Sequence, residues 1–417
     1  MNVAIPATGY STGVVSGAAL DRLAYLALCA FLFALPWEEA PQLGAFAIAR
    51  WLGLVTFGMA LLSLGVNRRH RKLSTMHYWM ISLVGLSMVS LLWTIDWDST
   101  ATRIGTYAQL LVVVWLIWEL AVVESRILGL MQAYVLGISF ASALTIYNFS
   151  TGTTAAQLQA ARGVEKWEET RYSIMGVNEN DLGLMLAMCI PIMIYLVIRT
   201  RGSLIRLFLW GQLVTCIVAI LLTGSRGSLI SAAIALLMLP LTIGYLTGRH
   251  KLAAVLACAG VVVCGVFFIP AGIWARLLGL STELTKGTLT HRTLIWSAGL
   301  AAFRDHPFLG VGSGAFPAAV LRIVDISYVA HNTFLSVLVE LGVVGALLLI
   351  GLVFSMFYAA FRMLYLERCL WVTVLLSWTV GVMALTWEYR KPTWVMFALL
   401  SAHVYARRKR HFEIEFS

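Results

Sequence analysis

Long uninterrupted runs of apolar residues recur along the chain, and short polar segments separate them. About twelve of these runs approach the roughly 20 residues that a helix needs to cross the hydrocarbon core of a membrane. The runs are continuous rather than alternating, so they predict helices and not the strands of a barrel. The predicted spans lie near residues 20–36, 45–65, 77–93, 104–121, 127–149, 180–198, 205–223, 228–247, 251–269, 332–361, 369–387 and 392–406.

The composition supports this interpretation. Of the 417 residues, 60% are hydrophobic and only 12% are charged. A soluble fold of this size would have to cover its surface with those same residues, so the composition excludes a soluble globular enzyme. We expect an all-α polytopic membrane protein in which residues 1–417 form a single transmembrane domain with about 12 helices.

Basic residues predict the orientation, because cytoplasmic loops carry an excess of Lys and Arg. Four basic segments fall on one side of the predicted bundle: residues 67–74, 199–206, 248–251 and 407–410. This pattern predicts that both termini are cytoplasmic. It also accounts for the net charge of +10 without a nucleic-acid partner, although the basic loops are expected to contact membrane lipids.

Acidic residues favour the opposite side, in segments 37–42 and 94–100. Two connections fit this pattern poorly. Segment 119–126 is weakly acidic on the predicted inner side, and segment 387–393 is slightly basic on the predicted outer side.

Two predicted outer loops are unusually long, and long loops are uncommon unless they are functional. They span about residues 150–179 and 270–331. In the second loop, apolar residues at helical spacing predict an amphipathic helix over about 290–305. Residues 310–317 (GVGSGAFP) follow as a predicted flexible, turn-rich segment. They do not open a βαβ unit, so we do not interpret them as a nucleotide-binding loop.

His331 begins the apolar run that follows the longest loop, and Asn332 is beside it. An imidazole titrates near neutral pH, so it could accept a proton from a sugar hydroxyl, and the amide could orient a polar substrate. The alternative is that His331 only anchors a helix end at the membrane surface. Glu340 is expected deep in the span, on the opposite face, hydrogen-bonded to a neighbouring helix.

Two arginines on the same predicted side could bind phosphate. Arg226 lies in the tight turn TGSRGS (223–228), and Arg292 lies in the first turn of the predicted loop helix. A guanidinium suits phosphate oxygens, and a helix N-terminus favours anions. Each arginine could instead be an ordinary interfacial charge. His291 is a weaker candidate.

The other long loop ends in Arg171, Asn178 and Asn180, close to the start of the sixth predicted span. Arg171 and Asn178 could bind sugar or phosphate groups, but amide side chains also cap helices. We expect Asn180 or Asp181 to be the cap. The predicted outer side lacks the paired acids that hold a divalent metal, so we expect no metal and no cofactor, with arginines neutralising a pyrophosphate instead.

These motifs together resemble the bacterial O-antigen ligase and O-antigen polymerase superfamily, and the ligases most closely. The sequence HNTFLSVLVELGVVG (331–345) is similar to the family's His-Asn pair followed by Gly-x-x-Gly, here Gly342 and Gly345. Residues 223–227 resemble its Ser-Arg-Gly turn. Residues 291–316 resemble its large periplasmic loop, with an arginine before a helix and a glycine-rich turn after it.

The resemblance implies a GT-C-like glycosyltransferase of the bacterial inner membrane, with its active site facing the periplasm. It implies transfer of a glycan from undecaprenyl pyrophosphate to lipid A–core in lipopolysaccharide biosynthesis, with inversion and without a metal. His331 would be the base, and Arg226 and Arg292 would hold the pyrophosphate. An O-antigen or exopolysaccharide polymerase is the alternative within the family, and a lipid-linked glycan transporter is the alternative from another class.

Overall fold

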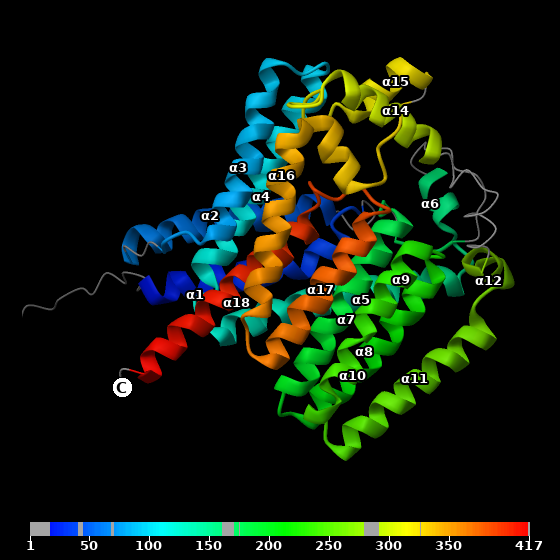
Figure 1. Cartoon of the computed structure of the whole chain (residues 1–417). Helices are drawn as coiled ribbons and strands as arrows, with labels where there is room; N and C mark the ends of the chain where they lie inside the picture. Colours follow the sequence, from blue (N-terminus) through cyan, green and yellow to red (C-terminus); the bar gives the residue numbers. More distant parts are fainter. Residues whose placement is uncertain are drawn as a thin grey trace, which may run out of the picture.

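The computed structural model describes residues 17–40, 45–67, 71–160, 171–174, 176–278, 292–325 and 327–415. Within these ranges the regular elements are helices, and no strand occurs in them. Figure 1 shows the long helices packed into one bundle, with α14 and α15 at one end of it. The predicted all-α fold is therefore confirmed.

The helices of the first half of the chain are α1 (Gly17–Ala34), α2 (Ala45–Asn67), α3 (Thr75–Val89), α4 (Trp97–Leu120), α5 (Glu124–Ser150), α6 (Ala155–Ala160) and α7 (Glu179–Arg199). Those of the second half are α8 (Ser203–Leu222), α9 (Arg226–Leu236), α10 (Met238–Thr242), α11 (Gly248–Phe268), α12 (Ala271–Leu278), α14 (Arg292–Asp305), α15 (Phe316–Val324), α16 (Thr333–Phe361), α17 (Tyr365–Val382) and α18 (Lys391–Glu415).

Among the described residues, 10 helices are long and apolar enough to cross a membrane, so the chain is a multi-pass membrane protein. They correspond to ten of the twelve predicted spans. The other two predicted spans are also helices, α17 and α18, but they are less apolar. Glu367 and Arg368 open α17, and the basic residues 407–410 extend α18. The count of twelve spans therefore stays a prediction.

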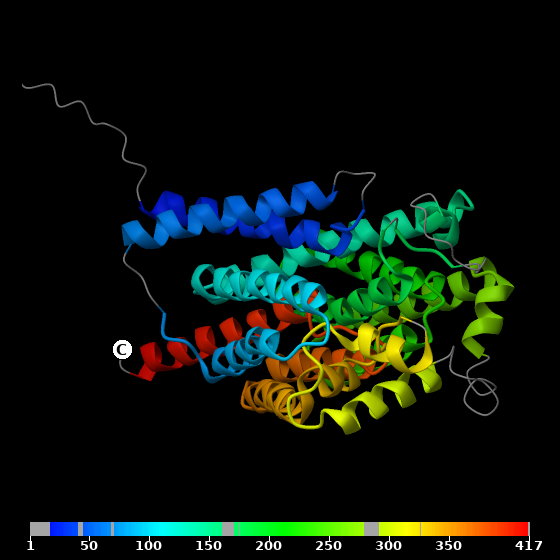
Figure 2. The same ribbon diagram turned by 90° about the horizontal axis from the view of Figure 1, so that it is seen from above.

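α7 forms the centre of the bundle and is almost wholly buried, because α5, α8, α9 and α17 pack around it. The hairpin of α1 and α2 lies along one flank of the molecule, as Figure 2 shows. A helix that is apolar on all sides belongs either in such a core or against lipid. The central position of α7 places its first residues beside the turn before α9.

Ion pairs explain why segment 387–393 is basic on the side predicted to be acidic. The guanidinium of Arg390 lies 2.9 Å from Glu39 and 3.0 Å from Asp181, and Lys391 lies 2.6 Å from Glu38. The acids of the segment 37–42 thus neutralise these bases. A count of Lys and Arg in single loops misses this compensation, which joins residues far apart in sequence.

α16 is not the single straight span that the sequence predicted over 332–361. Its backbone leaves the helical conformation at Gly342, where φ is 64° and ψ is −165°. Figure 1 shows two arms that meet at a sharp bend. Residues at equal distances from Gly342 line one groove: Leu338 with Ala346, Leu335 with Leu349, and Phe334 with Ile350. The arms therefore fold back toward each other, and residues 343–361 alone are about 28 Å long, enough to cross a membrane.

The two glycines of the Gly-x-x-Gly motif make this bend. A Cβ at Gly342 would lie 2.2 Å from the carbonyl oxygen of Phe308, and its positive φ is one that other residues rarely adopt. A Cβ at Gly345 would lie 2.2 Å from the Cβ of Leu341. Gly342 is therefore required by the positive φ of the bend and by the close approach of Phe308. Gly345 is required by the close approach of Leu341.

Candidate active site

His331 lies two residues before the first arm of α16. Its φ of 47° is in the left-handed region, which costs a residue other than glycine of order 1–3 kcal/mol. The side chain is half-buried, and no described group hydrogen-bonds to its ring. Strained residues of this kind gather at functional sites. The role of His331 as the base stays a prediction.

Arg292 is the first described residue of α14 and lies close enough to His331 to affect its charge. Burial, and secondly the positive charge of Arg292, lower the pKa of His331 to about 4. Burial also lowers the pKa of Arg292, and no described acid pairs with it. Because of its low pKa, His331 is a neutral imidazole at pH 7. A hydrogen bond of 2.8 Å from the indole nitrogen of Trp296 to the carbonyl oxygen of Ala330 fastens α14 to the residue before His331.

The sequence predicted a loop helix over about 290–305, and the described residues in this range form the helix α14 (Arg292–Asp305). His291, the weaker candidate, lies outside the described residues.

Arg226 opens α9, and the side chain of Ser225 caps that helix. The Nε of Arg226 donates a 2.7 Å hydrogen bond to the carbonyl oxygen of Arg276 in α12, and the Nε of Arg276 donates one of 3.2 Å to the carbonyl oxygen of Gly224. No described acid forms an ion pair with Arg226, so its charge is available to an anion near the start of α9.

The segment 384–387 connects Arg226 to the arm that carries His331. Gly227, next to Arg226, lies against Ala384, whose Cβ would be 3.4 Å from a Cβ at Gly227. The hydroxyl of Thr333 donates a 2.8 Å hydrogen bond to the carbonyl oxygen of Leu385. Arg226, Arg292 and His331 therefore lie at one end of the bundle, which we call the site end and define by residues 223–227, 292–331 and 383–390.

Arg171 supports the turn before α9 and is only 4% exposed. Its Nε donates a 2.7 Å hydrogen bond to the carbonyl oxygen of Thr223, and it also contacts Asn180 at 2.8 Å and Glu179 at 3.8 Å. These contacts fix the turn that presents Arg226. Binding of substrate by Arg171 stays a prediction.

The cap of α7 is Asn178, not Asn180 or Asp181 as the sequence suggested. The side-chain oxygen of Asn178 accepts a 2.9 Å hydrogen bond from the backbone nitrogen of Asn180, because the helix begins at Glu179. The carboxylate of Asp181 instead accepts hydrogen bonds from Trp387 and Arg390. A substrate-binding role of Asn178 stays a prediction, as its oxygen already has this donor.

An apolar groove of about 360 Å³ begins beside His331 and runs between the two arms of α16. Asn332 lies at its rim and also caps α16, accepting a 3.0 Å hydrogen bond from the backbone nitrogen of Leu335. The remaining lining is aliphatic or aromatic and belongs to α16 alone. A slender apolar chain suits such a groove, whereas a sugar does not. Contact between Asn332 and a substrate stays a prediction.

Glu340 has the partner on a neighbouring helix that the sequence predicted, but it is not deep in a span. Its carboxylate lies 3.5 Å from the guanidinium of Arg103 in α4. The same carboxylate accepts a 2.7 Å hydrogen bond from the backbone nitrogen of Gly314, in the loop before α15. The bend of α16 causes this difference, because it brings Glu340 against the loop at the site end.

Glu388 joins the same cluster and is 3% exposed. One of its carboxylate oxygens lies 2.9 Å from Arg103 and accepts a 3.1 Å hydrogen bond from Ser336. Burial raises the pKa of Glu388 to about 7, although Arg103 opposes this shift. Sequence reasoning did not find Glu388, because its partners lie on other helices.

Residues 211–350 match the model of the O-antigen ligase family. The matched segment contains Arg226, Arg292, His331 and both glycines of the bend, so the match confirms the resemblance that the motifs predicted. No curated protein matches the chain. The family consists of ligases and polymerases that act as glycosyltransferases, and the match does not distinguish between them.

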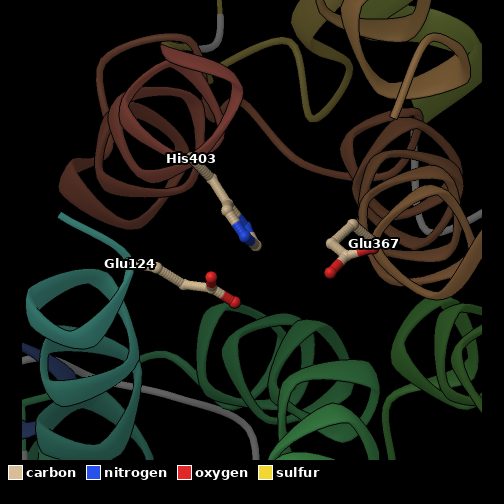
Figure 3. Close-up of side chains that lie close together, drawn as sticks. All are labelled: Glu124, Glu367 and His403. Carbon is tan, nitrogen blue, oxygen red and sulfur yellow. The ribbon is translucent and has the colours of Figure 1, made fainter. Parts of the chain in front are cut away.

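A second cluster of titratable groups lies at the other end of the bundle, where Figure 3 shows Glu124, Glu367 and His403 pointing toward one another. Their ligand atoms lie within 4.8 Å of one another, as in some metal sites. Arg407, however, pairs with both carboxylates. The indole of Trp371 donates a 3.0 Å hydrogen bond to Nδ1 of His403, so Nε2 of the neutral ring carries the proton and has no free electron pair.

We therefore interpret this cluster as an ion-pair network that joins α5, α17 and α18. It also explains why the acidic segment 119–126 occurs on the side predicted to be basic, because Glu124 is neutralised by Arg407 at 3.0 Å.

Proposed function

We propose that the protein is an O-antigen ligase. It would transfer a glycan from undecaprenyl pyrophosphate to a sugar of lipid A–core, with inversion and without a metal, at the periplasmic face of the inner membrane. The observation that carries this proposal is the half-buried, neutral His331 next to Arg292, which has no acidic partner among the described residues, within the family-matched segment.

The proposed chemistry follows from the neutral imidazole of His331 and the positive charge of Arg292. A sugar hydroxyl of the acceptor would attack the anomeric carbon of the donor glycan, and a glycosidic bond would form as the bond to pyrophosphate breaks. Neutral His331 would accept the hydroxyl proton, and the departing undecaprenyl pyrophosphate would keep the electron pair. Arg292 and Arg226 would stabilise the negative charge on that leaving group, in place of a divalent metal.

The groove between the arms of α16 supports a lipid-linked donor. Apart from Asn332 at its rim, the neighbour of His331, its lining is aliphatic or aromatic. An isoprenoid tail in this groove would leave the pyrophosphate at the site end, close to Arg292. The substrate would then enter from the bilayer, while the acceptor would arrive from the periplasmic side.

The proposed orientation places both termini in the cytoplasm and the site end in the periplasm. The basic segments predict this arrangement by the positive-inside rule. In this proposed orientation, residues 270–331 would form the long periplasmic loop of a single transmembrane domain over 1–417. The orientation would be tested by comparing the accessibility of a cysteine introduced at Arg322, which is exposed in that loop, with that of one at Arg249, which is exposed in the first turn of α11.

The function is tested with purified protein in liposomes, an undecaprenyl-pyrophosphate glycan and lipid A–core, with and without EDTA. A single capped lipid A–core product that survives EDTA is expected. A ladder of longer lipid-linked glycans would identify a polymerase instead. Movement of the donor across the membrane without transfer would identify a transporter and overturn the proposal.

A further inference from the structure

The segment 307–314 is inserted into the bend of α16. The helix break leaves backbone groups without helical partners, and the segment provides them. Val311 and Gly312 donate hydrogen bonds to the carbonyl oxygens of Val339 (3.0 Å) and Glu340 (2.9 Å). In return, the backbone nitrogen of Val343 donates to the carbonyl oxygen of Pro307 at 2.9 Å. The sequence predicted a flexible stretch from Gly310, but each backbone nitrogen from Gly310 to Gly314 donates a hydrogen bond.

The same segment is also held on its other side, by the turn between α3 and α4. The backbone nitrogen of Ile95 donates a 3.0 Å hydrogen bond to the carbonyl oxygen of Val311, and the hydroxyl of Ser90 accepts one of 3.1 Å from the backbone nitrogen of Ser313. Segment 307–314 therefore lies between two transmembrane elements.

One side chain completes the insertion. The carboxylate of Glu340 is 2% exposed, and it accepts the 2.7 Å hydrogen bond from the backbone nitrogen of Gly314. Ser336 also donates to it, at 3.3 Å, and Arg103 balances its charge. Burying a carboxylate costs free energy, so packing alone does not explain why that of Glu340 lies against the backbone amide of Gly314.

Segment 307–314 joins α14 to the first arm of α16 at the end away from Arg292 and His331. α14 ends at Asp305, just before the segment, and its first described residue is Arg292. The first arm of α16 begins at Thr333, two residues after His331, and carries Glu340 beside the bend. The two elements pack together, and the hydrogen bond from Trp296 to Ala330 ties them near the other end. Fixing the segment at Glu340 therefore fixes Arg292 relative to His331.

We propose that Glu340 is a positioning residue, which locks segment 307–314 into the bend of α16 and so holds Arg292 beside His331. The kinetic part of this inference rests on the proposed function, while the lock itself does not. Glu340 does not touch the substrate in this account. Its removal should lower turnover without a comparable loss of donor binding.

The lock is tested by hydrogen–deuterium exchange of the full chain in lipid nanodiscs. In Glu340→Ala, the amides of residues 311–314 should exchange at least about tenfold faster than in the wild type. Glu340→Gln keeps an acceptor for Gly314 and should stay within about threefold of the wild type. The matched control is Glu119→Gln, a buried acid at the other end of the bundle, which should leave these amides unchanged.

Unchanged protection of residues 311–314 in Glu340→Ala would overturn the lock, and so would a Gln variant as exposed as the Ala variant. If Glu340→Ala does not fold, Glu340→Asp replaces it, since its shorter side chain keeps the charge but cannot reach Gly314.

The positioning role is tested by steady-state transfer with the same variants. In Glu340→Ala, kcat should fall about 10- to 100-fold while the KM for the donor stays within about threefold, and Gln should restore kcat. Faster exchange with an unchanged kcat would overturn the positioning role. Faster exchange together with no transfer by the wild type would leave the lock in place and count against the proposed function instead.

Discussion

The indole nitrogen of Trp296 lies 2.8 Å from the carbonyl oxygen of Ala330, and this hydrogen bond fastens α14 to the residue that precedes His331. Arg292 lies one helical turn from Trp296, on the same face of α14. The contact thus brings together the side chains of Arg292 and His331, which are 39 positions apart in the sequence. It gives the candidate site a cation and a neutral imidazole side by side.

Replacing His331 should abolish transfer without unfolding the protein. In His331→Ala, kcat should fall about 10²- to 10⁴-fold, since a positioned general base contributes that much. The left-handed backbone conformation at this position is as unfavourable for histidine as for alanine, so the substitution should not lower the stability on this account. Product formation on gels measures the effect. The matched control is His306→Ala, an exposed histidine at the end of α14, which should keep wild-type activity.

The pH dependence should reveal the low pKa of His331. Transfer falls where the imidazole becomes protonated, so kcat/KM should stay level down to about pH 5 and decline through about pH 4. An ordinary histidine would produce this decline near pH 6.5. A decline centred at the ordinary value would contradict the burial of His331 in the free protein.

Arg292 should affect both donor binding and this pH dependence. Arg292→Gln should weaken donor binding about 10- to 100-fold, because a charge-assisted hydrogen bond contributes about 1.5–3 kcal/mol. It should also raise the pKa of His331, since Arg292 is the second cause of the shift, but not to the ordinary value, because burial remains.

The measurements are the donor KM and the pH of half-maximal kcat/KM. Arg304→Gln serves as the control, because this arginine is exposed in the last turn of the same helix. A shift of the pH profile in the control but not in Arg292→Gln would contradict the assigned geometry.

Gly342 should be indispensable for the bend of α16. In Gly342→Ala, the new Cβ would meet the carbonyl oxygen of Phe308 at 2.2 Å and would be strained at a φ of 64°. We expect a loss of about 1–3 kcal/mol in stability, with loss of activity. Thermal unfolding in detergent measures it. Gly58→Ala in α2 is the control, because a Cβ there has no neighbour within 4 Å.

Glu388 should make stability depend on pH. Its pKa is raised from 4.5 to about 7 in the folded protein, so its contribution is fully present below about pH 4.5 and is lost as pH rises through about 7. The loss should be on the order of 3 kcal/mol or less. Unfolding temperatures between pH 4.5 and 8 measure it. Glu388→Gln should flatten this dependence, and an equally steep slope in that variant would exclude Glu388 as its source.

The membrane fold could be predicted from the sequence, and a candidate site proposed, because both depend on local patterns. Apolar runs define helices, and the order of the arginine and histidine motifs places His331 directly after the long loop. The end of α14 at Asp305 was predicted for the same reason.

The bend of α16 could not be predicted in this way. Only Glu340 interrupts the apolar pattern near Gly342, which continues well beyond this glycine, and the inserted segment 307–314 shows why the helix reverses there. The same tertiary contacts moved Glu340 from a predicted deep position to the site end and hid Glu388. Similarly, the cap of α7 depends on where the preceding loop turns, which composition does not encode.

The reconstituted transfer reaction with wild type and His331→Ala tests the central claim most directly. Both proteins would be placed in liposomes with an undecaprenyl-pyrophosphate glycan and lipid A–core, and the products resolved on gels. We predict capped lipid A–core with the wild type and at least about a hundredfold less with the variant. Equal product from the two proteins would contradict the assignment of His331 as the base, and no transfer by either would contradict the proposed ligase.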